Sequence, residues 1–339
     1  MIPRVLVVGG GQNAEHEVSR ASATAVAAAL REHYRVSQLT IRRDGVWCDD
    51  SGPLAPGVAR SLSVAVSRIG DVDVVFPAVH GVLGEDGTLA ALCALAGTTL
   101  VGSSLGAGAV GMDKWVTKVV AEAIGVRTAP GRIIHARDIA AITFERPVVV
   151  KPVASGSSYG VTLAEDAAGL AEALRVAANF DSRILVEEPI HAREVDVAVL
   201  RDADGACWVA PALEIHASGV FDTDTKYDGS ARFSVPADLT EREQSALQRD
   251  ALRIFDALGC AGVARVDFFL TAEGPVLNEI NTLPGLSPAS QVPRMFAAAG
   301  VSYAELTARL VRAALASGTP QRQSGTPQSA ALMPRLRNE

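Results

Sequence analysis

VLNEINTLPGLSPAS, residues 276–290, joins the end of an apolar strand to polar side chains and a tight turn. Glu279 and Asn281 are two residues apart, and alternate strand residues point to the same face, so we expect both in one site. The apolar run VARVDFFL, which precedes this stretch, carries Arg265 and Asp267 at the same spacing. Two carboxylates and an amide at strand ends favour a hard cation such as Mg²⁺, which also binds substrate phosphates.

The turn that follows, Pro284-Gly285-Leu286, would carry exposed backbone N–H groups past such a metal. The structural alternative is a pair of buried strands whose polar ends have no chemical role, because a fold alone does not specify a function. Both interpretations predict two strands in this part of the chain.

Composition restricts the class of protein. The chain has 339 residues, 48% of them hydrophobic and 20% charged, with a net charge of −7. These values are typical of a globular protein and do not indicate a basic surface for nucleic acid. No apolar run reaches transmembrane length, and the first residues do not resemble a signal peptide. The four cysteines form no CxxC pair, so the sequence favours a cytoplasmic enzyme or binding protein with reduced thiols.

The chain divides into three predicted units. Alternating strand and helix patterns in residues 1–103 predict a parallel, doubly wound sheet. Residues 104–186 contain a helical pattern and two strands joined by a small Gly-Ser loop, which suggests an antiparallel hairpin. Residues 187–318 contain further strands and two long helices.

Local signals mark a helix start within the third unit and the end of that unit. Thr240 is a plausible N-cap with Glu243 three residues later, the pattern of a capping box. Residues 319–339 are rich in Gly, Pro, Ser, Gln and Arg, and we expect a disordered tail there.

The glycine turn after the first strand permits an alternative function. Gly9, Gly11 and Ala14 fit the dinucleotide fingerprint GxGxxG/A, which is a weak match alone. The second strand then ends with Arg42 and Arg43 rather than the acid that an NAD site requires. An NADP-dependent oxidoreductase therefore stays an alternative that rests on this turn only.

Polar residues also follow the predicted strands of the first unit. Glu15 and Glu17 lie where a helix begins, and acidic residues there stabilise the helix dipole. Glu15 could equally hold a substrate ammonium group, whereas a structural role is favoured for Glu17. His80 follows a strand and precedes an acidic, glycine-bracketed loop. Strand ends of open α/β sheets face ligands, so we place His80 in a substrate cleft rather than in a plain surface loop.

A phosphate-binding loop is predicted in KPVASGSSYG. Lys151 ends a strand, and the loop Gly156-Ser157-Ser158 offers backbone N–H groups that can surround phosphate oxygens. The motif GxxxxGK[ST] is missing from the sequence, so this is not a P-loop. A simple Gly-Ser turn is the structural alternative.

Two further segments are candidates for ligand binding. LVEEPIHARE offers backbone groups for an adenine edge and a carboxylate for ribose, although a solvated acidic linker explains it equally well. The polar stretch GVFDTDTKYDG carries Lys226 and Tyr227, and long polar loops in compact domains are often lids. An ordinary exposed loop is the alternative there.

Taken together, these segments resemble the D-alanine–D-alanine ligases of the ATP-grasp superfamily. The likeness runs from about residue 4 to residue 315 and keeps the order of all its motifs: AEHEVS, HGVLGEDGT, GMDK, KPVASGSS, KY, RVDFF and NEINTLPG. Each motif is short, but their joint order is specific. The resemblance implies an α/β chain of three domains: an N-terminal doubly wound parallel sheet, a small central α+β domain and a C-terminal α+β domain.

The resemblance also implies the co-substrate, the metals and their ligands. It implies ATP between the middle and last sheets, and two Mg²⁺ or Mn²⁺ ions held by Asp267, Glu279 and Asn281. It implies phosphate contacts from Lys114, Lys151 and the lid residue Lys226, and from the loop residues Gly156, Ser157 and Ser158. It implies adenine and ribose contacts from Glu187, Glu188, Ile190 and Glu194.

The remaining implied residues bind or activate the amino acids. Glu15 would bind the first D-alanine's ammonium group, with His80 nearby, and Glu15, Ser157 and Tyr227 would close the lid. Arg265 and the Gly285 N–H would stabilise the oxyanion, and Ser290 would contact the second carboxylate. A homodimer acting on D-alanine and ATP, without nucleic acid or membrane, is what the family likeness suggests.

The sequence departs from the family pattern in two places. The lid sequence FDTDTKYDG is shorter and less aromatic than usual, and Ala289–Gln291 differs from common versions of its turn. A specialised ligase that makes another dipeptide or a depsipeptide is therefore the second enzyme hypothesis, although Tyr227 favours a D-alanine acceptor. A non-catalytic nucleotide-binding protein is the third, and it predicts loss of metal ligands or phosphate lysines that this sequence retains.

Overall fold

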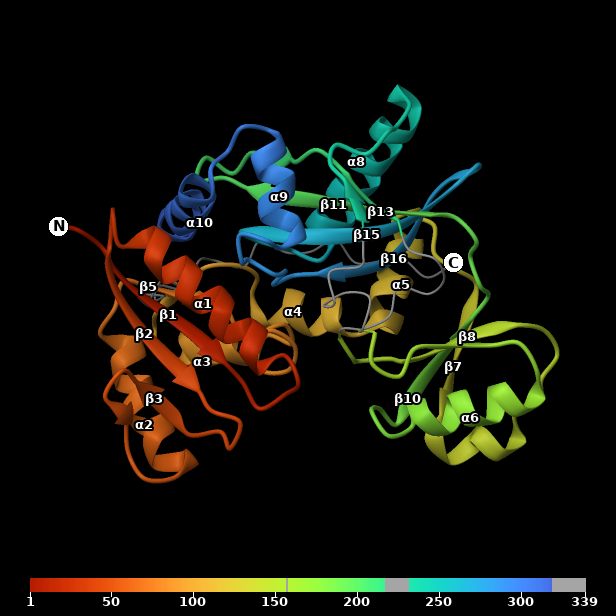
Figure 1. The fold of residues 1–339 in the computed structure, drawn as a ribbon, viewed down its shortest axis with the longest axis horizontal. Helices are drawn as coiled ribbons and strands as arrows, with labels where there is room; N and C mark the ends of the chain where they lie inside the picture. Colours follow the sequence, from red (N-terminus) through yellow and green to blue (C-terminus); the bar gives the residue numbers. More distant parts are fainter. Residues whose placement is uncertain (157, 217–231, 319–339) are drawn as a thin grey trace, which may run out of the picture.

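The computed structural model describes residues 1–156, 158–216 and 232–318, which form three sheets with their helices (Figure 1). Ser157, Lys226, Tyr227 and the predicted tail at 319–339 lie outside the described residues.

The first sheet has the order β4-β3-β2-β1-β5-β6. Its parallel strands are β1 (Arg4–Gly10), β2 (Arg35–Ile41), β5 (Val74–Pro77) and β6 (Thr99–Leu100), as the alternating pattern predicts. The short strands β3 (Trp47–Asp49) and β4 (Gly52–Pro53) add an antiparallel edge that the pattern did not predict. The helices of this unit are α1 (His16–Leu30), α2 (Val58–Gly70) and α3 (Thr88–Leu95).

The glycine turn after β1 has a packing role. A Cβ on Gly9 would lie 2.5 Å from the Ala23 Cβ of α1, and one on Gly10 would lie 2.2 Å from the Ile41 carbonyl oxygen. Gly10 also has a φ of 86°, which L side chains rarely adopt. Close packing of β1 against α1 therefore accounts for Gly9, and close approach to β2 accounts for Gly10, without a dinucleotide.

The second sheet has the order β7-β10-β8-β9. Its strands are β7 (Gly131–His135), β10 (Arg183–Glu187), β8 (Val148–Pro152) and β9 (Thr162–Ala164), and α6 (Ala167–Ala177) covers it beside the short 3-10 helix η1 (Ala136–Ala141). Strands β8 and β9 pair antiparallel, which confirms the predicted hairpin.

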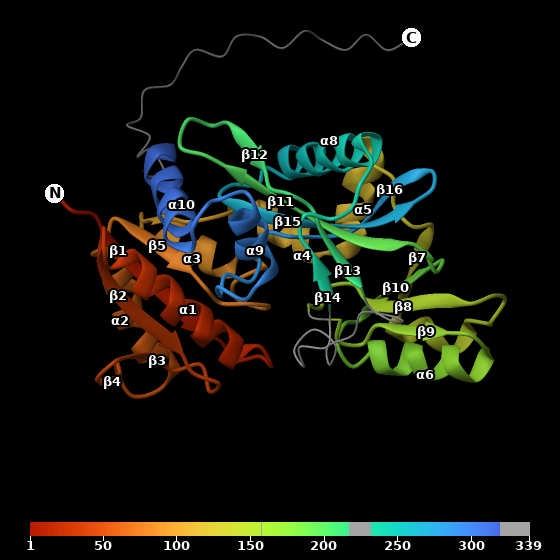
Figure 2. The ribbon, with the colours of Figure 1, turned by 45° about the horizontal axis from the view of Figure 1, so that its top comes forward.

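The third sheet contains β14 (Arg232–Ser234), β13 (Leu213–His216), β11 (Arg193–Arg201), β15 (Val263–Thr271) and β16 (Gly274–Asn281), with β12 (Cys207–Val209) paired to β11. One face packs against α8 (Glu241–Ala257), α4 (Leu105–Met112) and α5 (Lys114–Ala123) (Figure 2). The predicted capping box at the start of α8 is present between Thr240 and Glu243. The apolar run CWVAPALEI, whose pattern predicts one strand, forms two strands, β12 and β13.

Alternation along β11 and β15 gives this sheet one apolar and one partly polar face. Val197 and Val266 belong to the core shared with α8, as do their alternate neighbours. The residues between them, including Asp196, Arg265 and Asp267, point to the other face. That face meets α9 (Gln291–Ala298) and is where we expect chemistry.

The last helix, α10 (Tyr303–Ser317), returns to the first unit. Leu306, Leu310 and Val311 share a core with Val5 of β1 and Leu30 of α1. Both ribbon views place α10 beside α1 (Figures 1 and 2). The first and last thirds of the chain are therefore packed together.

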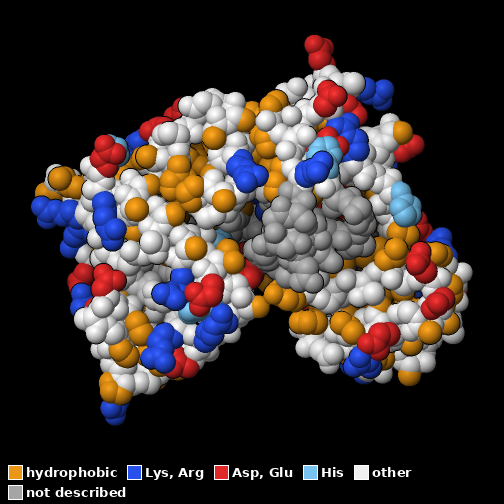
Figure 3. Space-filling model, in the orientation of Figure 1, with side chains coloured by type: hydrophobic (Ala, Val, Ile, Leu, Met, Phe, Trp, Pro, Cys, Tyr) orange, Lys and Arg blue, Asp and Glu red, His pale blue; other side chains and the backbone are white. Residues whose placement is uncertain are grey.

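The surface carries both charges side by side. On the face seen in Figure 3, Lys and Arg side chains alternate with Asp and Glu, and a notch separates the lobe at the left from the lobe at the lower right. Among the residues whose positions are described, no helix is long and apolar enough to cross a membrane.

Candidate active site

A row of carboxylates crosses three neighbouring strands of the third sheet. Asp196 of β11 is in register with Asp267 of β15, which is in register with Glu279 of β16. Arg265 is in register with Asn281, two residues along each strand, so the side chains that the i, i+2 spacing placed together share one face. The register skips Asn278 between Asp267 and Phe268, so a β-bulge lies within this row. Bulges re-aim side chains near functional sites.

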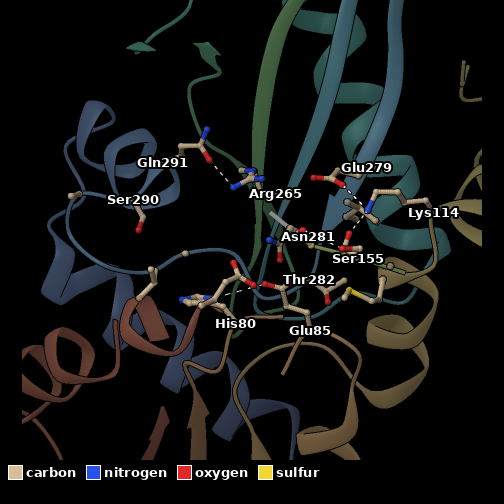
Figure 4. Close-up of a pocket in the computed structure, with 18 of the residues that line it drawn as sticks. His80, Glu85, Lys114, Ser155, Arg265, Glu279, Asn281, Thr282, Ser290 and Gln291 are labelled. Carbon is tan, nitrogen blue, oxygen red and sulfur yellow. Dashed lines mark hydrogen bonds and ion pairs between the residues drawn. The ribbon is translucent and has the colours of Figure 1, made fainter. Parts of the chain in front are cut away.

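Basic side chains compensate the carboxylates. The Arg265 Nε and Nη2 donate to the two Asp267 carboxylate oxygens, both at 2.7 Å. Lys114 Nζ lies 3.2 Å from Glu279 Oε2 and donates to the Ser155 carbonyl at 2.7 Å (Figure 4). Burial would lower the pKa of Arg265, but the charges of Asp267, Asp196 and Glu279 raise it, so this guanidinium stays charged.

A second buried cluster joins the middle sheet to the third. Lys151 Nζ lies 2.8 Å from one Glu187 oxygen and donates to Asn278 Oδ1 at 3.0 Å. Lys118 Nζ of α5 lies 2.6 Å from the other Glu187 oxygen and donates to the Ala129 carbonyl. Burial alone would raise the pKa of Glu187, but Lys151 and Lys118 hold it below its ordinary value.

The first turns of α1 hold the loop that contains His80. Ser19 Oγ accepts from the His80 N–H at 2.9 Å, Ser22 Oγ lies 3.1 Å from His80 Nε2, and Asn13 Nδ2 donates to the His80 carbonyl at 2.7 Å. His80 is 4% exposed. Burial lowers its pKa, which favours the neutral imidazole. Helix α1 therefore positions His80 at the end of β5.

Glu85 is an ionisable residue of this site that the sequence interpretation did not select. Its Oε1 lies 3.9 Å from His80 Nδ1 (Figure 4). Burial and the charge of Glu15 raise the pKa of Glu85 to about 7. A Cβ on Gly156 would lie 3.7 Å from a Glu15 oxygen and 3.9 Å from a Glu85 oxygen, so the Gly-Ser loop approaches both carboxylates.

The turn after β16 is held by hydrogen bonds. Asn281 Oδ1 accepts from the Leu283 N–H at 2.9 Å, and Tyr303 donates to the Leu286 carbonyl at 2.7 Å. A Cβ on Gly285 would lie 3.0 Å from Ser290 Oγ, so a larger residue there would need the Ser290 side chain to shift. The turn brings Gly285 and Ser290 to the wall of one cavity.

Two cavities contain most of the predicted residues. The smaller, about 200 Å³, is lined by Glu15, His80, Glu85, Lys114, Gly156, Arg265, Glu279, Asn281, Gly285 and Ser290. The larger, about 470 Å³, is lined by Lys114, Lys151, Ser158, Glu187, Glu188, Ile190, Glu194, Arg265, Asp267 and Glu279. Lys114, Arg265 and Glu279 line both. Glu17 lies away from them on the surface, 3.2 Å from Arg20.

The sequence interpretation missed four residues of this region: Glu85, Lys118, Asp196 and Gln291. Glu85 stood in the acidic loop beside His80, and Asp196 had the same i, i+2 spacing from Glu194 that selected Glu279 and Asn281. Lys118 lies inside a predicted helical pattern, and Gln291 begins a helix that was not predicted. Nothing local in the sequence separates either of them from surface residues.

The donor set at the strand ends fits a hard divalent cation. Asp267 and Glu279 are register partners, and the Asn281 amide oxygen adds a neutral donor on the same face. Within the described ranges, no group of three His, Cys, Asp or Glu side chains could hold a metal ion. A site here therefore depends on the amide of Asn281 or on ligand oxygens in addition to the two carboxylates.

Two sheets that enclose a cavity lined by lysines and carboxylates are the arrangement of ATP-grasp enzymes, and comparisons with known proteins agree. Family models described as the D-ala D-ala ligase N-terminus and C-terminus match residues 4–103 and 133–312. The D-alanine–D-alanine ligase of Streptomyces coelicolor is 40% identical, covering 92% of this chain and 93% of that one. This chain belongs to the D-alanine–D-alanine ligase family.

Solved structures share the fold. The VanG D-Ala:D-Ser ligase from Enterococcus faecalis superposes with a TM-score of 0.79 at 30% identity, over 92% of this chain and 99% of that one. The D-alanine–D-alanine ligase from Bacillus anthracis, solved in complex with ATP, gives 0.75 at 25% identity, over 92% and 97%.

Proposed function

We propose that this chain uses ATP to join two D-alanine molecules into D-alanyl-D-alanine for peptidoglycan. The observation that carries the proposal is the shared wall of the two cavities. Lys114, Arg265 and Glu279 line both, so a phosphoryl group held in the larger cavity lies next to a carboxylate held in the smaller one. Family membership supplies the identity of the substrates.

The larger cavity is proposed to bind ATP. Its lysines, Lys114 and Lys151, would neutralise phosphate oxygens, and Ser158 of the Gly-Ser loop would lie beside them. Glu188, Ile190 and Glu194 line the end suited to adenine and ribose, while the carboxylate of Glu187 is engaged by Lys118 and Lys151. The proposed contacts from Ser157 and Lys226 concern residues outside the described part.

The smaller cavity is proposed to bind the amino acids. Glu15 would take the ammonium group of the first D-alanine, with His80 and Glu85 behind it. Ser290 would contact the carboxylate of the second. The proposed closure of this site by Glu15 with Ser157 and Tyr227 also depends on undescribed residues.

The chemistry has two steps. A carboxylate oxygen of the first D-alanine attacks the γ-phosphorus of ATP, and the bond from this phosphorus to the β-phosphate oxygen breaks. ADP is the leaving group, and the product is an acyl phosphate. The amine of the second D-alanine, having lost a proton, attacks the acyl carbon; the C–O bond to phosphate then breaks and inorganic phosphate leaves. Arg265 and the Gly285 N–H would stabilise the tetrahedral oxyanion, and removing such a donor typically costs about 100- to 1000-fold in rate.

Asp267, Glu279 and Asn281 are the residues proposed to hold Mg²⁺ or Mn²⁺. When bound, these ions would neutralise charge on the phosphates. In this structure Glu279 pairs with Lys114 and Asp267 with Arg265, so protein cations balance the charge of both proposed ligand carboxylates.

The test is an assay of purified protein with ATP, Mg²⁺ and D-alanine, with phosphate measured and the dipeptide identified by mass. We expect D-alanyl-D-alanine, and we expect Glu279→Gln to abolish it while the protein stays folded. Glu273→Gln, an exposed residue at the far end of the β15–β16 hairpin, is the matched control. Turnover only with another amino or hydroxy acid would replace this function by a specialised ligase.

Family likeness also supports two further parts of the proposal: a homodimer and action in the cytoplasm. The exposed side chains of Leu95 and Leu105 are available to a subunit interface. Light scattering of the purified protein at micromolar concentration tests the homodimer, and a monomeric mass would remove it.

A further inference from the structure

We propose that Asp196 and Gln291 are positioning residues that hold Arg265 for the second step, in which the amine attacks the acyl phosphate. The inference rests on the proposed function, and it concerns two residues to which neither the sequence interpretation nor the family likeness gave a role. Figure 4 shows Gln291 and Arg265 side by side and joined by a hydrogen bond in the upper part of the view.

Two hydrogen bonds and one ion pair link these side chains in a closed set. Arg265 Nη1 donates to Gln291 Oε1 at 2.6 Å, and Gln291 Nε2 donates to Asp196 Oδ2 at 2.9 Å. The same Asp196 oxygen lies 3.5 Å from Arg265 Nε. Gln291 thus uses both ends of its amide, one toward the guanidinium and one toward its counter-ion.

Asp196 is suited to be a permanent counter-ion for Arg265. It is 2% exposed, and it stands in register with Asp267 across β11 and β15. Asp267 also pairs with Arg265, but it is a proposed metal ligand. A divalent cation held by Asp267 would compete with the guanidinium for the same two oxygens and would weaken that pair. Asp196 and Gln291 are not proposed metal ligands, so their contacts to Arg265 would remain.

The geometry also leaves part of Arg265 available to substrate. Asp267 and Gln291 engage three of the five guanidinium N–H groups. The others lie on Nη1 and Nη2, whose orientation is set by these same bonds. Loss of the Gln291 contact would let the Arg265 guanidinium rotate away from the oxyanion. ATP and the carboxylate of the first D-alanine could still bind and react.

The first experiment measures dipeptide formed per phosphate released. In the wild type we expect the two to be equal. Gln291→Leu keeps the size of the side chain but removes both amide bonds, and we expect dipeptide formation to fall by about 10- to 100-fold, the range found for partners that orient a catalytic group. The first step does not need the oxyanion contact, and an acyl phosphate that no amine captures is hydrolysed by water to D-alanine and inorganic phosphate. Phosphate release should therefore fall less than dipeptide formation, so the ratio of dipeptide to phosphate drops.

The matched control is Gln38→Leu. Gln38 accepts from Arg31 Nη2 at 3.3 Å on the surface of the first unit, so the same substitution removes an Arg–Gln bond far from the cavities. We expect it to keep equal dipeptide and phosphate.

A double-mutant cycle separates positioning from general damage. Arg265→Lys keeps the charge but lacks the planar fork that meets Gln291. In that background Gln291→Leu should change the rate of dipeptide formation by less than about threefold, because the guanidinium that Gln291 positions is no longer present. Equal rate losses in both backgrounds would mean that Gln291 acts independently of Arg265, and would overturn the proposal.

A binding measurement avoids activity altogether. With Asp196→Asn, Arg265 depends more on Asp267, so we expect Mg²⁺ to strengthen ADP binding less than in the wild type when measured by calorimetry. ADP binding without Mg²⁺ should be unchanged. An unaltered Mg²⁺ effect would refute the role of Asp196 as counter-ion.

The outcomes distinguish the two levels of the proposal. A wild-type protein that makes no dipeptide refutes the proposed function. An active wild type, with Gln291→Leu indistinguishable from Gln38→Leu, refutes the inference alone.

Discussion

The pKa of the buried Glu85 carboxyl depends on the charged side chains around the smaller cavity. Glu85 lies beside His80 and in the field of Glu15 and Glu279, with Arg265 as the opposing charge. Burial and the other carboxylates favour its protonated form. In the ligand-free protein, Glu85 therefore exchanges its proton near pH 7.

The stability of the protein should depend on pH because of this proton. The pKa of Glu85 rises from 4.5 to about 7 on folding, so the folded state keeps a proton that the unfolded state loses between these values. This contribution to stability is present at low pH and is lost as pH rises to about 7. Glu85→Gln stays neutral, so its melting temperature relative to wild type should be higher at pH 8 than at pH 5, by about 2 °C or more.

Differential scanning fluorimetry without metal measures this difference, and Glu165→Gln at an exposed position is the control. A Glu85→Gln difference that is constant from pH 5 to pH 8 would show that Glu85 has an ordinary pKa.

Single residues differed in how well the sequence revealed them. Strand alternation alone placed Glu279, Asn281, Arg265 and Asp267 on one face, and the register confirms it. Gln291 could not be found in this way, because its partners lie 26 and 95 positions away in the chain. A hydrogen bond between distant segments leaves no periodic signal in a sequence.

At the scale of elements, strong local signals were reliable. The capping box at Thr240 and Glu243 is present in full, since each side chain bonds the backbone of the other. By contrast, α9 and η1 are short, with 8 and 6 residues, and were not predicted. Their positions depend on tertiary packing, which overrides weak propensity.

Removal of the cap should destabilise α8. Thr240→Ala loses the bond to the Glu243 N–H, and we expect a loss of about 1 kcal/mol in the free energy of unfolding. Denaturant titration measures this value. Thr24→Ala is the control, because Thr24 is a mid-helix residue whose hydroxyl bonds only to the Arg20 carbonyl of its own helix. A cap variant as stable as this control would mean that the third sheet alone holds α8 in place.

At the scale of the whole molecule, Glu187 connects separate layers. Glu187 lies at the end of β10 and forms an ion pair with Lys151 of β8 within the middle sheet. It forms a second ion pair with Lys118 of α5, a helix that packs on the third sheet. The sequence predicted three units in order, but it gave no sign that α5 packs on β16 or that a buried ion cluster crosses between sheets. Such contacts are fixed only when the units assemble.

Lys118→Met should therefore be costly. It leaves the buried Glu187 with one lysine, and breaking a buried ion pair typically costs about 3–5 kcal/mol. Arg146→Met is the matched control, because Arg146 pairs with the neighbouring Glu188 on the surface, where a pair contributes less than about 1 kcal/mol. Equal losses of unfolding free energy for the two variants would mean that the buried cluster does not hold the layers together.

The return of α10 to α1 has a consequence for how the chain reaches this structure. The strands of the first sheet leave the ribosome well before α10 does, yet Leu306, Leu310 and Val311 complete their core. Val5, Val26 and Leu30 therefore lack these partners until the last helix has been synthesised. The nascent N-terminal lobe must keep an apolar face exposed while about 200 residues are added, at roughly 5–20 residues per second, which makes this face a natural target for a chaperone.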